Sequence, residues 1–140
     1  MASLIYNIFK GNLMNGEVDL EADSVYVTLV DDTKVAAFSA TDTDYSVTNE
    51  LATAGGYTRG ADATNLLASS AVTVAATTKW DATDHAWAAA TFTAYGAVIY
   101  DATVGATNNL ICAIDFGGAK TVSAGTFTII WDTDGIITLA

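Results

Sequence analysis

Apolar residues gather in short runs along the second half of this chain, and polar, glycine-containing breaks separate the runs. Between residues 91 and 139 they read FTAYGAVIYD, LICAIDFGG, GTFTIIW and IITL. Runs of this length, rich in Val, Ile, Thr, Phe, Tyr and Trp, are typical of buried or half-buried strands rather than helices. We therefore expect strands throughout this stretch, in a sheet around which the rest of the chain is organised.

Further strands are expected upstream. Apolar and mixed positions alternate over Val25–Val30, AVTVAA spans 71–76, and VAAF at 35–38 is a candidate short strand. Short strands at regular spacing, with turn signals between them and no βαβ pattern, are typical of an antiparallel sandwich or barrel. The prediction is one mainly β domain over residues 1–140: an antiparallel β-sandwich or a jelly-roll-like barrel.

The N-terminal segment is the one candidate helix. Apolar residues in SLIYNIFKGNLM follow roughly helical spacing, Ser3 is a candidate N-cap and Gly16 a natural stop. We expect a short helix or arm over residues 1–16, ahead of a β body over 17–140. The segment is too apolar to lie free in water, so it packs on its own domain or forms an assembly contact. The candidate contact residues are Leu4, Ile5, Tyr6, Ile8 and Phe9.

The middle of the chain gives the weakest pattern. TDTDYSVTNELA suggests a helical turn over 46–51, and TAGGYTRGADATNL is a glycine-rich stretch that we expect to project as a loop. It carries Tyr57 and Arg59, the only arginine. With Trp80 and Trp87 these are candidate surface recognition residues, for example a sugar-binding platform. The alternative is that the aromatic side chains pack in the core or at its rim.

The charge balance limits the classes of partner. The 140 residues are 51% hydrophobic and 15% charged, with a net charge of −11. This composition argues against disorder, and the negative charge argues against nucleic acid and anionic membranes as partners. The charge maintains solubility or complements a basic partner. Neither a signal peptide nor an apolar run of about 18 residues is present, so we expect synthesis and retention in a cytoplasm until assembly.

Candidate chemistry is sparse. Cys112, the only cysteine, lies in an apolar run, where a buried inert thiol is expected. His85, the only histidine, lies near Asp81 and Asp84, but no GxSxG motif is present. We interpret it as a solvated loop histidine. A hydrolase would need His85 within hydrogen-bond reach of a serine and an aspartate.

The aspartate-rich turns are candidate metal sites. Asp132, Asp134 and Gly135 resemble the opening of a calcium loop, but the glutamate that closes an EF-hand loop is absent. Aspartates between strands commonly cap and close turns. One cysteine and one histidine argue against zinc. No phosphate-binding or dinucleotide motif is present. The sequence therefore predicts no catalytic residue, no metal and no cofactor.

Several segments taken together resemble a known group of proteins. They are IYNIFKGNLMNGEVDLEADSVYVTLV, NELATAGGYTRGA, WDATDHAWAAATFTAYGAVIYD, LICAIDFGG and GTFTIIWDTDGIITL. The set resembles small β-rich virion proteins of tailed bacteriophages. The resemblance spans nearly the whole chain, and its motifs are packing and turn motifs without catalytic content.

The resemblance implies a non-enzymatic virion structural protein, foremost a capsid decoration (cement) protein on the capsid surface. The implied partners are the major capsid protein and further copies of the chain, as a homo-oligomer of trimer type. A second hypothesis is a head-fibre or tail component that binds a receptor or carbohydrate. That hypothesis predicts exposed aromatic side chains around Tyr57, Trp80 and Trp87.

Overall fold

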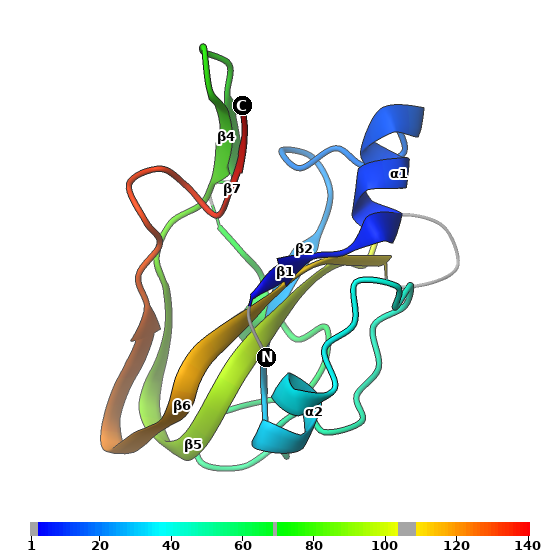
Figure 1. The fold of residues 1–140 in the computed structure, drawn as a ribbon. Helices are drawn as coiled ribbons and strands as arrows, with labels where there is room; N and C mark the ends of the chain where they lie inside the picture. The colour runs from blue at the N-terminus through cyan, green and yellow to red at the C-terminus, as the bar shows by residue number, and fades with distance from the viewer. Residues whose placement is uncertain (1–2, 69, 104–108) are drawn as a thin grey trace.

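The chain folds into two antiparallel sheets with short helices beside them (Figure 1). The computed structural model describes residues 3–68, 70–103 and 109–140. The larger sheet has the order β1-β6-β5-β2, and the smaller one the order β3-β4-β7. The strands are β1 (Leu4–Ile5), β2 (Val25–Val30), β3 (Ala71–Thr73), β4 (Thr78–Asp81), β5 (His85–Asp101), β6 (Asn109–Ile129) and β7 (Ile137–Leu139).

The predicted fold class is confirmed at this level: the chain is mainly β and antiparallel, with a short N-terminal helix. The smaller sheet packs against one face of the larger sheet through Trp80 and Ile137, which is compatible with a sandwich-like fold. The jelly-roll-like barrel is not confirmed.

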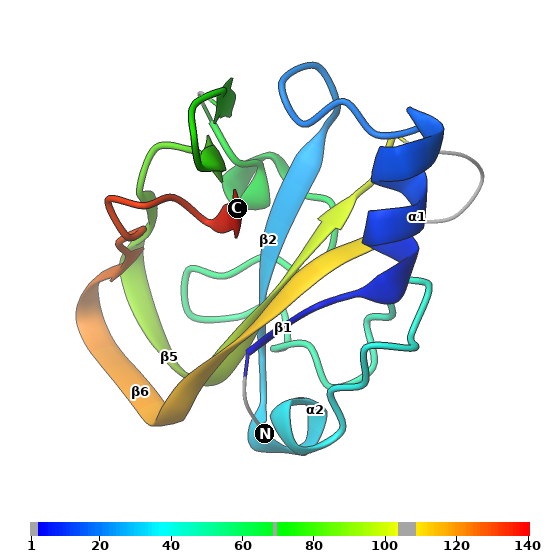
Figure 2. The same ribbon diagram turned by 45° about the horizontal axis from the view of Figure 1, so that its top comes forward.

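A long hairpin of β5 and β6 dominates the structure. Two strands were expected at 110–116 and 125–131, with a turn between them, but β6 runs through both. The expected turn is instead a pair of bulges. The register moves from Gly96↔Asp115 to Ala94↔Lys120, and later from Phe92↔Val122 to Ala90↔Gly125. Extra residues in one strand of a pair bend that strand. The hairpin accordingly turns a sharp corner (Figures 1 and 2).

Positive backbone φ angles mark both bulges of β6. Gly117 and Gly118 have φ of 71° and 134° in the first, and Ala124 has φ of 48° in the second. Glycine adopts these angles without a steric penalty, whereas alanine does so at a cost. The glycine pair that suggested a turn therefore supplies the conformational freedom for a bulge.

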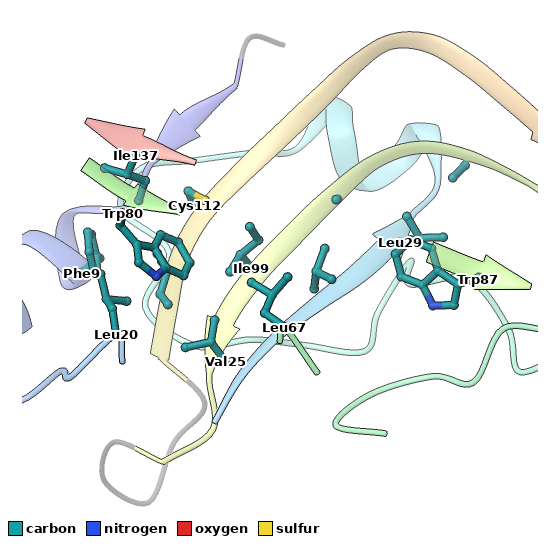
Figure 3. Close-up of a cluster of buried hydrophobic side chains, with 14 of the residues drawn as sticks. Phe9, Leu20, Val25, Leu29, Leu67, Trp80, Trp87, Ile99, Cys112 and Ile137 are labelled. Carbon is teal, nitrogen blue, oxygen red and sulfur yellow. The ribbon is translucent and has the colours of Figure 1, made fainter. Parts of the chain in front are cut away.

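The part of the larger sheet around β2 is buried on both faces, and alternate side chains along the strand enter two different core clusters. Val25, Val27 and Leu29 of β2 point into the larger core cluster, which also holds Trp80 and Trp87 (Figure 3). Val30 belongs to the second cluster, with Tyr6, Val35, Phe38, Val98, Tyr100, Leu110 and Ala113. Cys112 lies in the larger cluster, so its predicted burial is confirmed, and burial raises the pKa of its thiol to about 12.

The helices differ from the predictions at their starts. Helix α1 (Asn7–Asn15) begins after Tyr6, and Ser3 lies outside it, where its Oγ accepts a hydrogen bond from the Asp115 N–H at 3.0 Å. Gly16 ends α1 with φ of 70°, as predicted. Helix α2 (Asp32–Ala36) replaces the expected strand at 35–38, because the Asp31 carboxylate caps it by accepting the Lys34 N–H at 2.9 Å.

The middle segment closes the outer edge of β2. The helical turn expected over 46–51 does not form. Instead, Glu50 forms an antiparallel β-bridge with Val30, and the Leu51 N–H donates to the Leu29 carbonyl at 2.9 Å. Further along, after the 3-10 helix η1 (Ala63–Asn65), Leu67 donates to the Val25 carbonyl at 2.9 Å. The β2 edge of the sheet is therefore paired with backbone at both ends.

Candidate interaction surface

The N-terminal segment is part of the fold. Leu4 and Ile5 pair with Ala113 and Cys112 of β6. Tyr6 is 0% and Phe9 3% exposed, so neither side chain is accessible to a partner, and their role as assembly contacts is contradicted. The remaining candidates, Leu4, Ile5 and Ile8, are half-buried against the cores, and a contact through their exposed parts stays a prediction.

The glycine-rich loop does not project, contrary to the sequence prediction. It lies along the edge of β5, where the Thr91 N–H donates to the Gly55 carbonyl at 2.8 Å. A Cβ atom at Gly55 would clash with the Thr91 carbonyl oxygen, and one at Gly56 would lie 2.8 Å from the Ala89 oxygen. Two backbones approach this closely only through glycine. The two glycines therefore hold the loop against residues 88–91 of β5.

Tyr57 follows these glycines and is buried, at 2% exposed. Its hydroxyl accepts the Leu29 N–H at 3.0 Å and donates to Glu50 Oε1 at 2.5 Å. Its ring packs edge-on against Phe92 at 6.0 Å. The prediction of a surface recognition role for Tyr57 is wrong, because both the ring and the hydroxyl are used inside the protein.

Glu50 is the centre of this network and is only 3% exposed. Besides Tyr57, the Gly60 N–H donates to its Oε1 at 2.7 Å, and the Tyr45 hydroxyl donates to its Oε2. Burial raises the pKa of Glu50, while the hydrogen bonds and the nearby Arg59 guanidinium oppose part of that rise. These donors hold the Glu50 carboxylate in place and fix the loop around it.

Arg59 is exposed, and its guanidinium makes two hydrogen bonds to backbone carbonyls. Nη2 donates to the Glu50 carbonyl at 2.6 Å and Nε to the Leu51 carbonyl at 3.1 Å. The side chain therefore ties the loop to the segment beside β2. These bonds use two of the five guanidinium N–H groups, so a recognition role for Arg59 stays a prediction.

The two tryptophans are buried as well. Trp87 is 2% exposed, and its Nε1–H donates to Asn65 Oδ1 at 2.9 Å. Trp80 is 3% exposed and donates to the Ser70 hydroxyl. A sugar-binding platform needs exposed rings, so this prediction is wrong for both residues. Their indole N–H groups are satisfied within the fold, which explains why they can be buried.

His85 is buried rather than solvated, at 8% exposed, so that interpretation is also wrong. Its Nε2 donates to the Thr64 carbonyl at 2.9 Å, and its ring meets Trp87 edge-on at 4.5 Å. Burial lowers its pKa. Among the described residues no hydrogen bond joins His85 to a serine or an aspartate, which is the arrangement that the hydrolase hypothesis requires.

The acidic turns serve local structure. Asp132 Oδ1 accepts the Asp134 N–H at 2.9 Å, and Asp84 Oδ1 accepts the Trp131 N–H at 3.0 Å. Within residues 3–68, 70–103 and 109–140 no three His, Cys, Asp or Glu side chains gather as a metal site would require. These carboxylates close turns and join loops to strands.

The outer edge of β6 is the surface that the sequence did not reveal. In the described part of the chain, the only strand beside that edge is β1, which pairs with Cys112 and Ala113. From Phe116 to Ile129 the paired strand is β5 alone. Figures 1 and 2 both show this part of β6 at the outside of the molecule. An uncovered edge presents backbone donors and acceptors to any strand that approaches.

A hollow lies beside this edge, inside the bend of β6. It has a volume of about 320 Å³ and is lined by Phe116, Lys120, Phe127, Thr128 and Ile129. The two phenylalanine rings lie 6.2 Å apart, and Phe127 also packs on Phe92 at 5.2 Å. The hollow is thus an apolar extension of the core that reaches the surface, with one cation at its rim.

Other exposed apolar side chains form a second surface near α1. Met14 is 88% and Leu139 51% exposed. Between α1 and the smaller sheet lies an apolar groove of about 110 Å³, whose lining includes Leu13, Leu139 and Trp80. Exposed apolar groups of this kind are typical of protein contacts.

Comparisons with known proteins give no relative for this chain: no family model, curated protein or solved structure matches it. None of the helices in the described residues has the length and apolar character that crossing a bilayer requires.

The sequence did carry one signal for the β6 edge. Phe127 and Ile129 alternate with Thr126 and Thr128, and no carboxylate occurs from 116 to 131.

Proposed function

We propose that this protein is a non-enzymatic structural protein of a tailed-phage virion, and that it acts as a capsid decoration protein. It binds the major capsid protein on the assembled head and contacts further copies of itself there. Binding to the assembled shell stabilises that shell by mass action, because the dispersed subunits do not offer the same site. Its polar groups maintain the body, and its edge and apolar surfaces make contacts.

The observation that carries this proposal is the uncovered outer edge of β6 with its apolar hollow. Free proteins normally cover, shorten or charge such edges, since they invite pairing. In a symmetric assembly the same edge becomes a binding surface. The exposed Met14 and Leu139 add a second apolar surface, beside the groove next to α1.

The receptor-binding alternative lacks the exposed aromatic surface that it predicts. It rested on exposed aromatic side chains at Tyr57, Trp80 and Trp87, and all three are buried. The aromatic residues beside the β6 hollow, Phe116 and Phe127, lack the hydroxyl or indole group that commonly hydrogen-bonds a sugar.

The test is to disrupt the gene in the phage that encodes the chain and to image the purified particles. We expect heads that assemble but release DNA at lower temperature than wild-type heads, and recovery when purified protein is added back. Images of the restored particles should show added density on the outer capsid. Density confined to the tail, or particles of unchanged stability that do not bind the protein, would contradict the proposal.

A further inference from the structure

The bend divides the outer edge of β6 into segments, and the segment after the bend is regular. From Gly125 to Ile129 the strand β6 has no inserted residue: Phe127 lies opposite Trp87, Ile129 lies opposite His85, and Thr126 lies opposite the irregularity of β5. The irregularity between Trp87 and Ala90 lies in β5, which advances by an extra residue there. Five consecutive residues of β6 are therefore available as an undistorted strand edge.

The direction of the backbone groups follows from one hydrogen bond. The Thr91 N–H donates to Gly55, so it points away from β6. Backbone groups alternate along a strand, so Ala90 and its partner Gly125 face each other. Continuing the alternation, Thr126 and Thr128 turn their N–H and C=O groups to the outside. Phe127, between them, points its ring into the aromatic cluster with Trp87 and Phe92.

We infer that a second copy of this chain pairs with this edge, in antiparallel direction, with Phe127 facing its own copy across a two-fold axis. In this register each Thr126 exchanges both backbone hydrogen bonds with the Thr128 of the other copy. The Phe127 residues occupy the closer, non-hydrogen-bonded position, where side chains touch. The two hollows then lie side by side at the contact and are covered together.

The register is fixed by the limits of the regular segment. Centring the axis on Gly125 or Thr126 brings the bulged Ala124, with its φ of 48°, into the pairing. Centring it on Thr128 or Ile129 extends the pairing beyond the end of β6. The axis at Phe127 alone keeps residues 125–129 of both copies fully paired.

Charge favours a second copy at this place. Each copy carries a net charge of −11, so two copies repel each other across most of their surface. From Phe116 to Trp131 no carboxylate occurs, and the only charged residue is Lys120. This edge lets two identical acidic chains approach without placing carboxylates face to face. An isologous contact also requires only one kind of surface.

The contact is small. A five-residue strand pair buries less than the roughly 1,000 Å² that stable interfaces need, so the dimer is weak in dilute solution. It gains strength where copies are held next to one another. The inference concerns the chain alone and does not require binding to a capsid, so its failure and the failure of the proposed function are separate results.

Cysteine cross-linking tests the register. Residues in a hydrogen-bonded pair have Cα atoms about 5.5 Å apart, within disulfide range, whereas diagonal neighbours lie about 7–8 Å apart. A mixture of Thr126→Cys and Thr128→Cys proteins should therefore form disulfide-linked dimers about tenfold faster than either variant alone. Native Cys112 is buried, so the wild-type protein serves as the control for background oxidation. Thermal unfolding confirms that both variants are folded.

A second control is Thr133→Cys, at an exposed position in the loop after β6, mixed with Thr126→Cys. This pair should cross-link only at the rate of random collisions. Equal rates for all mixtures would overturn the inference. Sedimentation of the wild-type protein at rising concentration should show a monomer–dimer equilibrium. A monomer at every concentration, or the trimer that the family resemblance implies, would also overturn it.

Discussion

The two outer edges of the β5–β6 hairpin differ in how the chain treats them. Along β5, β2 pairs with one half and the glycine-rich loop lies on the other, tied there by Gly55, Tyr57 and Glu50. Along β6, β1 covers only the start, and the edge from Phe116 onward has no strand beside it in the described residues. One edge is closed by a buried polar network, and the other is left open.

The closed β5 edge stabilises the fold, whereas the open β6 edge is available for binding. The β5 edge uses the chain's arginine, a buried glutamate and two tyrosine hydroxyls to fix a loop. The β6 edge uses small and hydroxyl-bearing residues, and among the described residues no buried polar network like that around Glu50 is found there. We therefore expect mutations on the β5 side to change stability, and mutations on the β6 side to change association.

The largest expected effect is at Gly55. Alanine there must adopt φ of +57° and clash with the Thr91 carbonyl, so the loop has to leave the β5 edge. We expect Gly55→Ala to lower the free energy of unfolding by about 2–5 kcal/mol. Gly60→Ala is the matched control, with φ of +83° but open space around its Cβ, and should cost about 1 kcal/mol. Denaturant unfolding measures both, and equal losses would show that close packing at Gly55 is unimportant.

Tyr57→Phe comes next, because it removes one hydroxyl from a buried network. The Leu29 N–H loses its acceptor and Glu50 Oε1 keeps only the Gly60 N–H. We expect a loss of about 2–4 kcal/mol, since unsatisfied buried polar groups are costly. Tyr26→Phe, on a half-buried ring of β2, is the control and should cost less than about 1 kcal/mol. Similar losses of unfolding free energy for the two variants would show that the buried network does not stabilise the loop.

Glu50 should give the β5 edge a pH dependence. Because burial raises its pKa in the folded protein, its contribution to stability is present in full below its ordinary pKa and is lost as pH rises through the raised value. His85, whose pKa is lowered, changes stability with pH in the opposite direction. It is present in both the wild type and the Glu50→Gln variant, so its effect cancels in the comparison. From about pH 4 upward, the wild type should therefore lose stability relative to Glu50→Gln. Unfolding curves measured at several pH values test this, and parallel pH profiles would contradict it.

The smallest effect is expected on the open edge. Thr128→Ser alters an exposed side chain that no other described strand covers, so the free energy of unfolding should change by less than about 0.5 kcal/mol. Denaturant unfolding at low protein concentration is the appropriate measurement, since it avoids any contribution from association. A loss above about 1 kcal/mol would mean that this part of β6 is supported by contacts within the monomer.

The sequence predicted a strand correctly from the alternation over Val25–Val30 and from the apolar run at 136–139. It was wrong about β6, because a glycine pair signals a turn and a bulge equally well, and only the pairing with β5 decides between them. It was wrong about 35–38 because the Asp31 cap starts a helix there.

Burial was the least predictable property of the candidate site. His85 was expected in a solvated loop, and Tyr57, Trp80 and Trp87 were candidates for surface recognition; for these three the alternative, packing in the core or at its rim, is confirmed. Each is buried because a distant group satisfies its polar atom, as Asn65 does for Trp87. Such long-range partners leave no local pattern. The open edge of β6 was equally hidden, since the absence of a neighbouring strand is a property of the whole topology.

The pairing of β1 with β6 has a consequence for synthesis. Leu4 pairs with Ala113, so 113 − 4 = 109 residues separate the two partners. At roughly 5–20 residues per second, a ribosome needs roughly 5–20 s to make the partner after the first strand has emerged. During that time β1 lacks the strand with which it pairs. Chaperone occupancy of nascent chains should therefore begin early and end only after β6 has left the exit tunnel.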